Sequence, residues 1–136
     1  MVLDFTLMSG EKRGGFNMQL TLFTETAIDS AHKLVGYDGK CAQMHGHTWL
    51  LKVWVKGDDS QKDKVGILFD FGNINKIKEM LDHQIINDVI VANPTAENIS
   101  FWIYEKLKEM KPDLKFKVRL YETAVLKHTY CERSDF

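Results

Sequence analysis

The first half of the chain contains two runs in which β-branched and aromatic residues occupy most of the hydrophobic positions. The first run, residues 19–28, predicts a strand that continues towards His32. The second run, residues 45–56, predicts another strand, and the glycine- and aspartate-containing segment 33–40 between the two runs indicates a loop. A strand, a loop and a strand in this order indicate an antiparallel pair, which would bring His32 close to His45 and His47.

The middle of the chain shows apolar residues at helical spacing. This spacing predicts a helix that is capped by Asn73 or Gly72 and ends near residues 82–83. Thr95 is the predicted N-cap of a second helix. The apolar positions behind the two predictions are Ile74, Ile77, Met80 and Leu81 in the first helix, and Ile99, Trp102, Ile103, Leu107 and Met110 in the second.

Two further strands complete the pattern. Residues 116–122 alternate between apolar and polar positions, and residues 125–131 are predicted to form the last strand. The resulting order is ββααββ, which predicts an α+β fold with an antiparallel four-stranded sheet and two helices on one face. The sequence shows no internal repeat, low-complexity tract or linker, so we expect residues 18–136 to form one domain.

Residues 1–17 differ from the rest of the chain. The segment 9–15 is polar and glycine-rich, which disfavours a place in the core. The residues Lys12 to Gly15 can be encoded by a purine-rich stretch that resembles a bacterial ribosome-binding site. We therefore hypothesise that Met18 is the natural start; a native protein whose mass begins at Met1 would contradict this. The alternatives are a mobile tail or a short edge strand.

Composition and charge exclude some classes of function. The 136 residues are 44% hydrophobic and 27% charged, as in ordinary globular proteins. A net charge of −1 gives no bulk electrostatic support for binding nucleic acid or a membrane surface. No apolar run approaches the roughly 18 residues of a membrane span, the N-terminus lacks the apolar core of a signal peptide, and two distant cysteines make no disulfide framework. We therefore expect a cytoplasmic protein.

A histidine pair marks the predicted start of the second strand. His45 and His47 are two residues apart, so both side chains would share one face of a strand. Catalytic zinc usually takes three protein ligands and leaves a fourth position for water or substrate, and His32 is the nearest third candidate. The ligand types favour zinc over magnesium or calcium and leave iron and nickel open. The alternative is a pair of exposed or turn-bonded imidazoles.

Three residues are candidates for proton transfer. Cys41 precedes the histidine pair and would act as a nucleophile or acid–base group if a nearby imidazolium or metal lowered its pKa; otherwise it is a small buried hydrophobic residue. Asp82 and His83 place a carboxylate beside an imidazole at a helix end, where Asp can orient a His that shuttles protons. The alternative is that His83 caps the helix and Asp82 is solvated.

Two glutamates are candidates for ligand binding. Glu122 follows the alternating strand, where its carboxylate would accept two N–H groups from the edge of a heterocycle, or would be a solvated charge. Glu97 is most simply a favourable charge in the first turn of a helix. His128 and Cys131 are predicted to be ordinary sheet residues.

Taken together, these features resemble the 6-pyruvoyl-tetrahydropterin synthase family, and in particular its bacterial branch, the 6-carboxy-tetrahydropterin synthases. The resemblance covers nearly all of residues 19–132. The motifs that carry it are Ala31-His32, Cys41-x-x-x-His45-Gly46-His47, Phe69-Asp70-Phe71, Leu81-Asp82-His83-x-x-x-Asn87-Asp88, Asn93-Pro94-Thr95-x-Glu97-Asn98 and Tyr121-Glu122-Thr123.

The resemblance implies roles by position. His32, His45 and His47 match the family's zinc ligands, and Cys41, Asp82 and His83 match its catalytic thiol and proton relay. Glu122 matches the residue that anchors the pterin, and Thr95 and Glu97 match further pterin contacts. The family fold is the tunnelling fold (T-fold), in which sheets assemble into a barrel, usually in a homohexamer of two stacked trimers. Its sites lie at subunit interfaces, so Cys41 and the Asp82–His83 pair can come from different chains.

The implied substrate is 7,8-dihydroneopterin triphosphate, which the bacterial branch converts to 6-carboxy-tetrahydropterin, acetaldehyde and triphosphate on the path to queuosine. The short spacing between Cys41 and His45 resembles that branch.

The alternatives are a 6-pyruvoyl product from the same substrate, or a protein that binds zinc and a pterin without turnover. Cys41 argues against a further branch that carries glutamate there and makes a folate precursor. Ala96 departs from relatives that carry a hydroxyl, and Lys33, Lys40 and Lys127 are candidates for binding phosphate by proximity.

Overall fold

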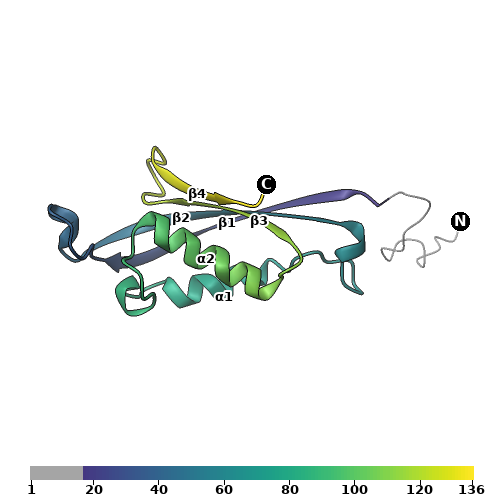
Figure 1. Ribbon diagram of the computed structural model, residues 1–136, viewed down its shortest axis with the longest axis horizontal. Coiled ribbons are helices and arrows are strands. Elements are labelled where there is room, and N and C mark those ends of the chain that lie inside the picture. The colour runs from purple at the N-terminus through teal and green to yellow at the C-terminus, as the bar shows by residue number, and fades with distance from the viewer. Residues whose placement is uncertain (1–16) are drawn as a thin grey trace, which may run out of the picture.

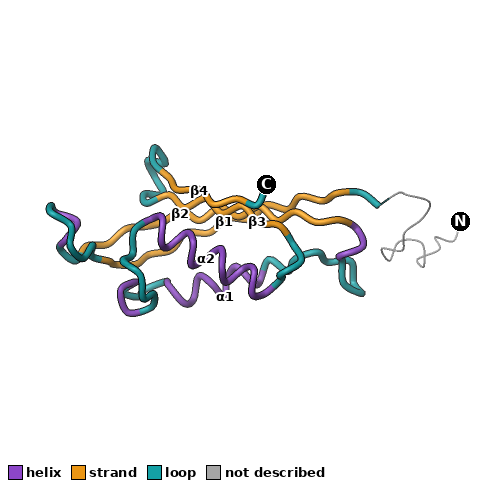
Figure 2. Tube along the Cα trace, viewed as in Figure 1, coloured by secondary structure: helices purple, strands orange, loops and turns teal. Residues whose placement is uncertain are grey.

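The computed structural model describes residues 17–136, which form a sheet covered on one face by two helices (Figures 1 and 2). The predicted ββααββ order is confirmed. The elements are β1 (Gln19–His32), β2 (His45–Asp58), α1 (Gly72–Leu81), α2 (Ala96–Met110), β3 (Lys115–Tyr121) and β4 (Tyr130–Ser134), with short 3₁₀ turns at Lys40–Ala42, Asp59–Gln61 and Ile86–Asp88.

The sheet is antiparallel, in the order β1-β2-β3-β4. β1 and β2 pair along their full 14-residue length, from Gln19 opposite Asp58 to His32 opposite His45. Both strands extend well beyond the helices in Figure 1. The end that extends furthest holds Gln19 and Asp58, whereas the three histidines lie at the other end, where His32 and Trp49 are buried.

The core lies between the sheet and the helices. Side chains alternate across a strand, so every second residue of β2 and β3 packs against the apolar stripes of α1 and α2. Fully burying one such side chain contributes about 1.5–3 kcal/mol relative to its exposure. The buried residues include Ile28, Trp49, Leu51, Val53, Val55, Phe116, Val118 and Leu120 from the sheet and Ile74, Ile77, Leu81, Ile99, Ile103 and Leu107 from the helices.

The other face of the sheet carries cations stacked on aromatic rings. The Arg119 guanidinium lies 5.1 Å from the Trp54 ring centroid and 4.4 Å from that of Tyr130. Lys117 lies over the rings of Trp54 and Phe136. Long basic side chains cover apolar surface with their stems, so this face is partly shielded without a second layer of helices.

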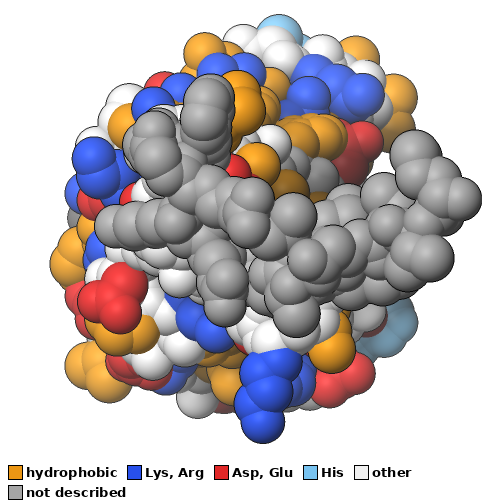
Figure 3. Space-filling model, turned by 90° about the vertical axis from the view of Figure 1, so that its right-hand side faces the viewer, with side chains coloured by type: hydrophobic (Ala, Val, Ile, Leu, Met, Phe, Trp, Pro, Cys, Tyr) orange, Lys and Arg blue, Asp and Glu red, His pale blue; other side chains and the backbone are white. Residues whose placement is uncertain are grey.

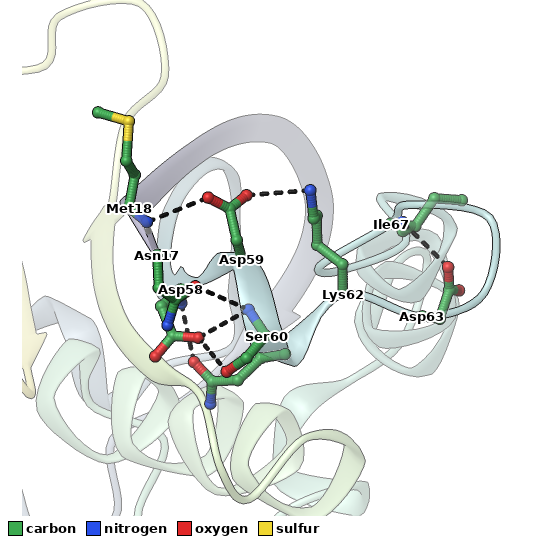
Figure 4. Close-up of polar contacts among 9 residues, drawn as sticks. Asn17, Met18, Asp58, Asp59, Ser60, Lys62, Asp63 and Ile67 are labelled. Carbon is green, nitrogen blue, oxygen red and sulfur yellow. Dashed lines mark hydrogen bonds and ion pairs between the residues drawn. The ribbon is translucent and has the colours of Figure 1, made fainter. Parts of the chain in front are cut away.

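A network of backbone and side-chain hydrogen bonds closes the turn after β2 (Figure 4). Asp59 accepts from the Met18 backbone N–H at 3.1 Å and pairs with Lys62 at 2.9 Å, and hydrogen bonding from Lys62 lowers the pKa of the Asp59 carboxyl. These contacts tie the first residues of β1 to the turn. Basic and acidic side chains are interspersed around this end of the molecule (Figure 3), as the net charge of −1 leads one to expect.

The last strand differs from the prediction. β4 spans Tyr130–Ser134, whereas the sequence pattern predicted residues 125–131. Residues 122–129 form a loop with a turn at 124–126, after which Lys127 adopts a positive φ of 53° and donates its N–H to the Thr123 carbonyl at 3.1 Å. The apolar pair Val125 and Leu126 suggested a strand, but both side chains are exposed. His128, predicted to be a sheet residue, therefore lies in this loop.

The start of α1 also differs in detail. Its N-cap is Phe71, with no side-chain cap, whereas Gly72 or Asn73 was predicted. Asp70 takes over the capping role, because its carboxylate accepts from the Gly72 N–H at 2.8 Å. Residues 1–16, and with them almost all of the predicted 1–17 extension, lie outside the described residues. None of the helices in residues 17–136 combines the length and apolar character that a membrane crossing requires.

Candidate metal centre and active site

Three histidines meet where β1 ends and β2 begins. The register places His32 opposite His45, and Ser30 opposite His47. Because alternate residues share a face, all three imidazoles point to the face that the helices cover, next to the buried Trp49. The ring centroids of the three histidines lie 4.6–5.0 Å apart. The predicted grouping of His32 with the His-x-His pair is thus present in the structure.

Backbone carbonyls orient two of the rings. Nδ1 of His32 lies 2.7 Å from the carbonyl oxygen of Pro94, and Nδ1 of His45 lies 2.7 Å from that of Gln43. A ring that donates its Nδ1–H to a carbonyl keeps a lone pair on Nε2. Metal-binding histidines are commonly held in this way.

The cluster fits a metal ion. One ligand atom from each of His32, His45, His47 and Glu122 lies within 4.8 Å of the others. Nitrogens on a tetrahedral zinc lie about 3.3 Å apart at bond lengths of about 2 Å, so a small contraction would complete the site. The Nε2 atoms of the three histidines are buried without a hydrogen-bond partner in the described chain. A buried unsatisfied polar atom costs about 1–3 kcal/mol, a penalty that a bound metal removes.

Burial also keeps two of the rings neutral. Desolvation lowers the pKa of His32 and of His47 below the ordinary value of 6.5, and it outweighs the opposing effect of the Glu122 carboxylate. A neutral imidazole has the lone pair that a metal requires. Both rings therefore offer a nitrogen lone pair to a cation at neutral pH.

Glu122 is a member of this cluster that the sequence analysis did not place there. Its Oε1 lies 3.2 Å from Nε2 of His47 and 3.9 Å from Nε2 of His32. The contact with His47 lacks hydrogen-bond geometry, since that Nε2 remains unpartnered. The signal was present in the alternation of β3: Glu122 has the same parity as the buried Leu120, and so it points to the same face as the histidines.

Cys41 lies in the 3₁₀ turn Lys40–Ala42, within the loop between β1 and β2. Its side chain is half-buried and its thiol is free. The Cys41 carbonyl accepts the Leu34 N–H at 2.8 Å, which closes the base of the loop. The structure thus places the candidate thiol four residues before His45, on the segment that leads into the metal centre.

Asp82 and His83 follow the end of α1 and lie against β1. The Asp82 carboxylate accepts the Asp29 N–H at 2.9 Å, and the His83 N–H donates to the Asp29 carbonyl at 2.6 Å. His83 adopts a positive φ of 58°, a strained conformation that such contacts must hold in place. Within the described chain no hydrogen bond joins the Cys41 thiol, the Asp82 carboxylate and the His83 ring. The relay of Cys41, Asp82 and His83 therefore stays a prediction.

A pocket of about 180 Å³ lies between the start of α2 and the end of β3. Both candidate glutamates line it, but only the Glu97 carboxylate is without a partner in the described chain. Thr95 is the N-cap of α2, as predicted, and its hydroxyl oxygen accepts the Asn98 N–H at 3.1 Å. This hydroxyl therefore stabilises the start of the helix. The residues that line the pocket are Ala96, Glu97, Leu120, Glu122, Thr129, Tyr130 and Cys131.

An antiparallel sheet with two helices on one face, a group of residues that can bind a metal and an adjacent carboxylate-lined pocket define a T-fold enzyme. The model of the 6-pyruvoyl tetrahydropterin synthase family matches residues 21–133. The chain belongs to this family, and it is an enzyme of the lyase class with pterin synthase activity.

Individual relatives and a solved structure support the family and the fold. The 6-carboxy-5,6,7,8-tetrahydropterin synthase of Synechocystis is 31% identical over 111 residues, which cover 76% of this chain and 86% of the relative. The dihydroneopterin monophosphate aldolase of Pyrococcus furiosus is 33% identical over 74% of this chain and 86% of its own. The solved structure of Caenorhabditis elegans 6-pyruvoyl tetrahydropterin synthase superposes with a TM-score of 0.68 at 22% identity, over 89% of this chain and 99% of that chain, and supports the fold.

Proposed function

We propose that the protein is a zinc-dependent 6-carboxy-tetrahydropterin synthase. Its substrate would be 7,8-dihydroneopterin triphosphate, and its products 6-carboxy-tetrahydropterin, acetaldehyde and triphosphate. The observation that carries the proposal is the convergence of His32, His45 and His47 beside a pocket lined by two carboxylates. A relative that is 31% identical bears the same name, and Cys41 has the spacing from His45 that resembles the bacterial branch.

His32, His45 and His47 would hold the zinc through their Nε2 atoms. Bound there, the ion would supply Lewis acidity to the hydroxyl groups of the substrate side chain. The hydrogen bonds from Nδ1 of His32 and of His45 fix the tautomer that this binding needs. Glu122, beside His47, would complete the polar surroundings of the ion and tune the imidazole through its negative charge.

The pocket beside α2 would receive the pterin ring. A pterin presents a 2-amino group and a ring N–H side by side, which a carboxylate can bind with two parallel hydrogen bonds. The sequence assigned this task to Glu122, but one oxygen of that carboxylate faces the histidines. Within residues 17–136 both oxygens of the Glu97 carboxylate are without a partner. Because Glu97 also lies in the first turn of α2, we assign the anchor to Glu97.

Cys41, Asp82 and His83 would move protons to and from the carbons of the substrate side chain. The thiol lies on the loop that enters the metal centre, and His83 lies beside the outer edge of β1. Because one chain does not join the two groups, we propose that they meet across a subunit interface, in the homohexamer of two stacked trimers that is usual for the family. Two cysteines without a disulfide fit a reducing cytoplasm, and the product would enter queuosine synthesis.

The test is anaerobic incubation of the zinc-loaded protein with 7,8-dihydroneopterin triphosphate, followed by mass analysis of the pterin and assay of acetaldehyde. A 6-carboxy product with acetaldehyde supports the proposal, and a 6-pyruvoyl product moves the enzyme to the other branch. The Pyrococcus relative makes an aldolase the second candidate. A parallel incubation with 7,8-dihydroneopterin monophosphate tests this candidate, since an aldolase would release a 6-hydroxymethyl pterin and a phosphorylated two-carbon aldehyde, which mass analysis separates from the other products.

A further inference from the structure

The outer edge of β1 is bonded to another part of the chain near the metal centre. This edge faces away from β2. At Asp29 it bonds to Asp82 and His83, as described above, and at Ala31 the N–H donates to the Gln84 carbonyl at 3.0 Å. A short parallel bridge joins Ala31 to Ile85. The segment after α1 thus covers the outer edge of β1 at the end of this strand. Figure 1 shows the two side by side.

Two asparagine side chains continue this pairing beyond the end of β1. Oδ1 of Asn87 accepts the Lys33 N–H at 2.9 Å, and Nδ2 of Asn87 donates to the Lys33 carbonyl at 3.0 Å. Asn93 does the same with Val35, at 2.9 Å and 3.0 Å. A carboxamide offers one acceptor and two donors in a plane, as a peptide group does. Each asparagine therefore takes the place of a residue on a neighbouring strand.

The pairing fixes the base of the loop that carries Cys41. In an extended chain, successive residues turn their N–H and C=O groups to opposite sides. Lys33 and Val35 face the asparagines, and Leu34 between them faces the other way and donates to the Cys41 carbonyl at 2.8 Å. The chain from His32 to Val35 is thereby bonded on both sides.

The same segment also contacts the metal centre and α2. Asn93 precedes Pro94, whose carbonyl orients His32, and the Asn93 carbonyl accepts from Nδ2 of Asn98 in α2 at 2.8 Å. Asn87 follows His83 by four residues. One segment therefore holds the strained His83, a metal-orienting carbonyl and both asparagines.

We propose that Asn87 and Asn93 are positioning residues, which hold the Cys41 loop in register with His83 and with the metal-binding histidines. The proposal rests on the proposed function for its effect on turnover. The four hydrogen bonds carry it, because each asparagine satisfies both polar groups of one loop residue. Neither side chain need touch the substrate.

The test uses Asn87→Asp and Asn93→Asp, which keep size and shape but replace the donor Nδ2 with an acceptor. Each variant loses the bond to the loop carbonyl and places an oxygen against it. The matched control is Asn75→Asp, on the exposed face of α1, which changes the charge in the same way. We expect kcat to fall by roughly 10–100-fold in the two test variants, the scale of a misplaced reacting group, with KM and zinc content close to those of the parent protein.

Two readouts need no substrate. Hydrogen exchange should accelerate at the amides of Lys33 and Val35, and site-resolved mass spectrometry should show faster alkylation of Cys41 by iodoacetamide. Parent-like kcat, exchange and alkylation in both Asp variants would overturn the proposal. If the parent protein makes no pterin product, the proposed function fails, while exchange and alkylation still decide the positioning role. Should an Asp variant fail to fold, the uncharged Asn87→Ser and Asn93→Ser variants enter the same comparisons and decide it.

Discussion

The His32 ring and the Pro94 carbonyl are joined by a hydrogen bond of 2.7 Å. This bond connects the last residue of β1 to the residue that precedes the N-cap of α2. It fixes the ring tautomer and ties a candidate metal ligand to the helix whose first turn carries Glu97. The candidate metal centre and the pocket that we propose for the pterin are therefore positioned by the same junction.

Replacing a histidine of the cluster should abolish metal binding without unfolding the chain. We expect His45→Ala to lower zinc affinity by more than the roughly 10–100-fold that loss of an outer-shell partner costs. Zinc content after dialysis against a metal buffer, measured by elemental mass spectrometry, checks this. The control is His128→Ala, in the exposed loop before β4, which should keep its zinc. Equal zinc content in the two variants would contradict the site.

The metal-free protein should lose stability as the pH falls below about 6.5. Desolvation lowers the pKa of His32 and of His47 in the folded chain, so the unfolded chain takes up protons first. The free energy of unfolding then falls with decreasing pH, by up to about 1.4 kcal/mol per unit for each histidine. The free energy of unfolding begins to fall near pH 6.5, the ordinary pKa of histidine. It stops falling below the lowered pKa that each histidine has in the folded chain.

Urea unfolding of chelator-treated protein across this pH range measures the effect. Asp59, Asp63 and Asp135 also have lowered pKa values, but their contribution is lost below their ordinary value of 3.8 and so in a separate window. A flat profile between pH 7 and the acidic limb would show that the histidines do not titrate differently in the folded chain.

The two glutamates of the pocket should have separable effects. Glu97→Gln removes a charged anchor, and losing a hydrogen bond to a charged group costs about 1.5–3 kcal/mol, or roughly a 10–150-fold rise in KM. Zinc content should stay unchanged in this variant. Glu122→Gln should weaken zinc binding and lower kcat, because this carboxylate faces His47. The reverse pattern, with Glu122→Gln raising KM alone, would restore the anchor role that the sequence assigned to Glu122.

Much of this site follows from the periodicity of the sequence. His45 and His47 share a face because a strand alternates, and an antiparallel partner brings in His32. The same rule places Glu122 beside them, since it continues the alternation of β3. The family motif drew attention to its ligand-binding role instead. The order of the helices and strands was likewise predictable from local patterns.

Other features depend on contacts that no local pattern encodes. The turn at Lys127 replaced a predicted strand because a positive φ and one hydrogen bond to Thr123 outweigh the apolar pair before it. The asparagine contacts with Lys33 and Val35 arise only once the segment after α1 lies against β1. Asparagine is common in turns, so its spacing alone does not predict such pairing.

Replacing the Cys41 thiol should separate proton transfer from metal binding. If the thiol acts as an acid–base group, Cys41→Ala should lower kcat by about 10²–10⁴-fold and leave zinc content and pterin affinity near those of the parent protein. Asp38→Asn, in the same loop and exposed, is the control for disturbance of the loop. Steady-state kinetics with product detection by mass measure the effect. A Cys41→Ala enzyme with parent-like kcat would remove the thiol from the mechanism, while a joint loss of zinc and activity would assign Cys41 to the architecture of the metal centre instead.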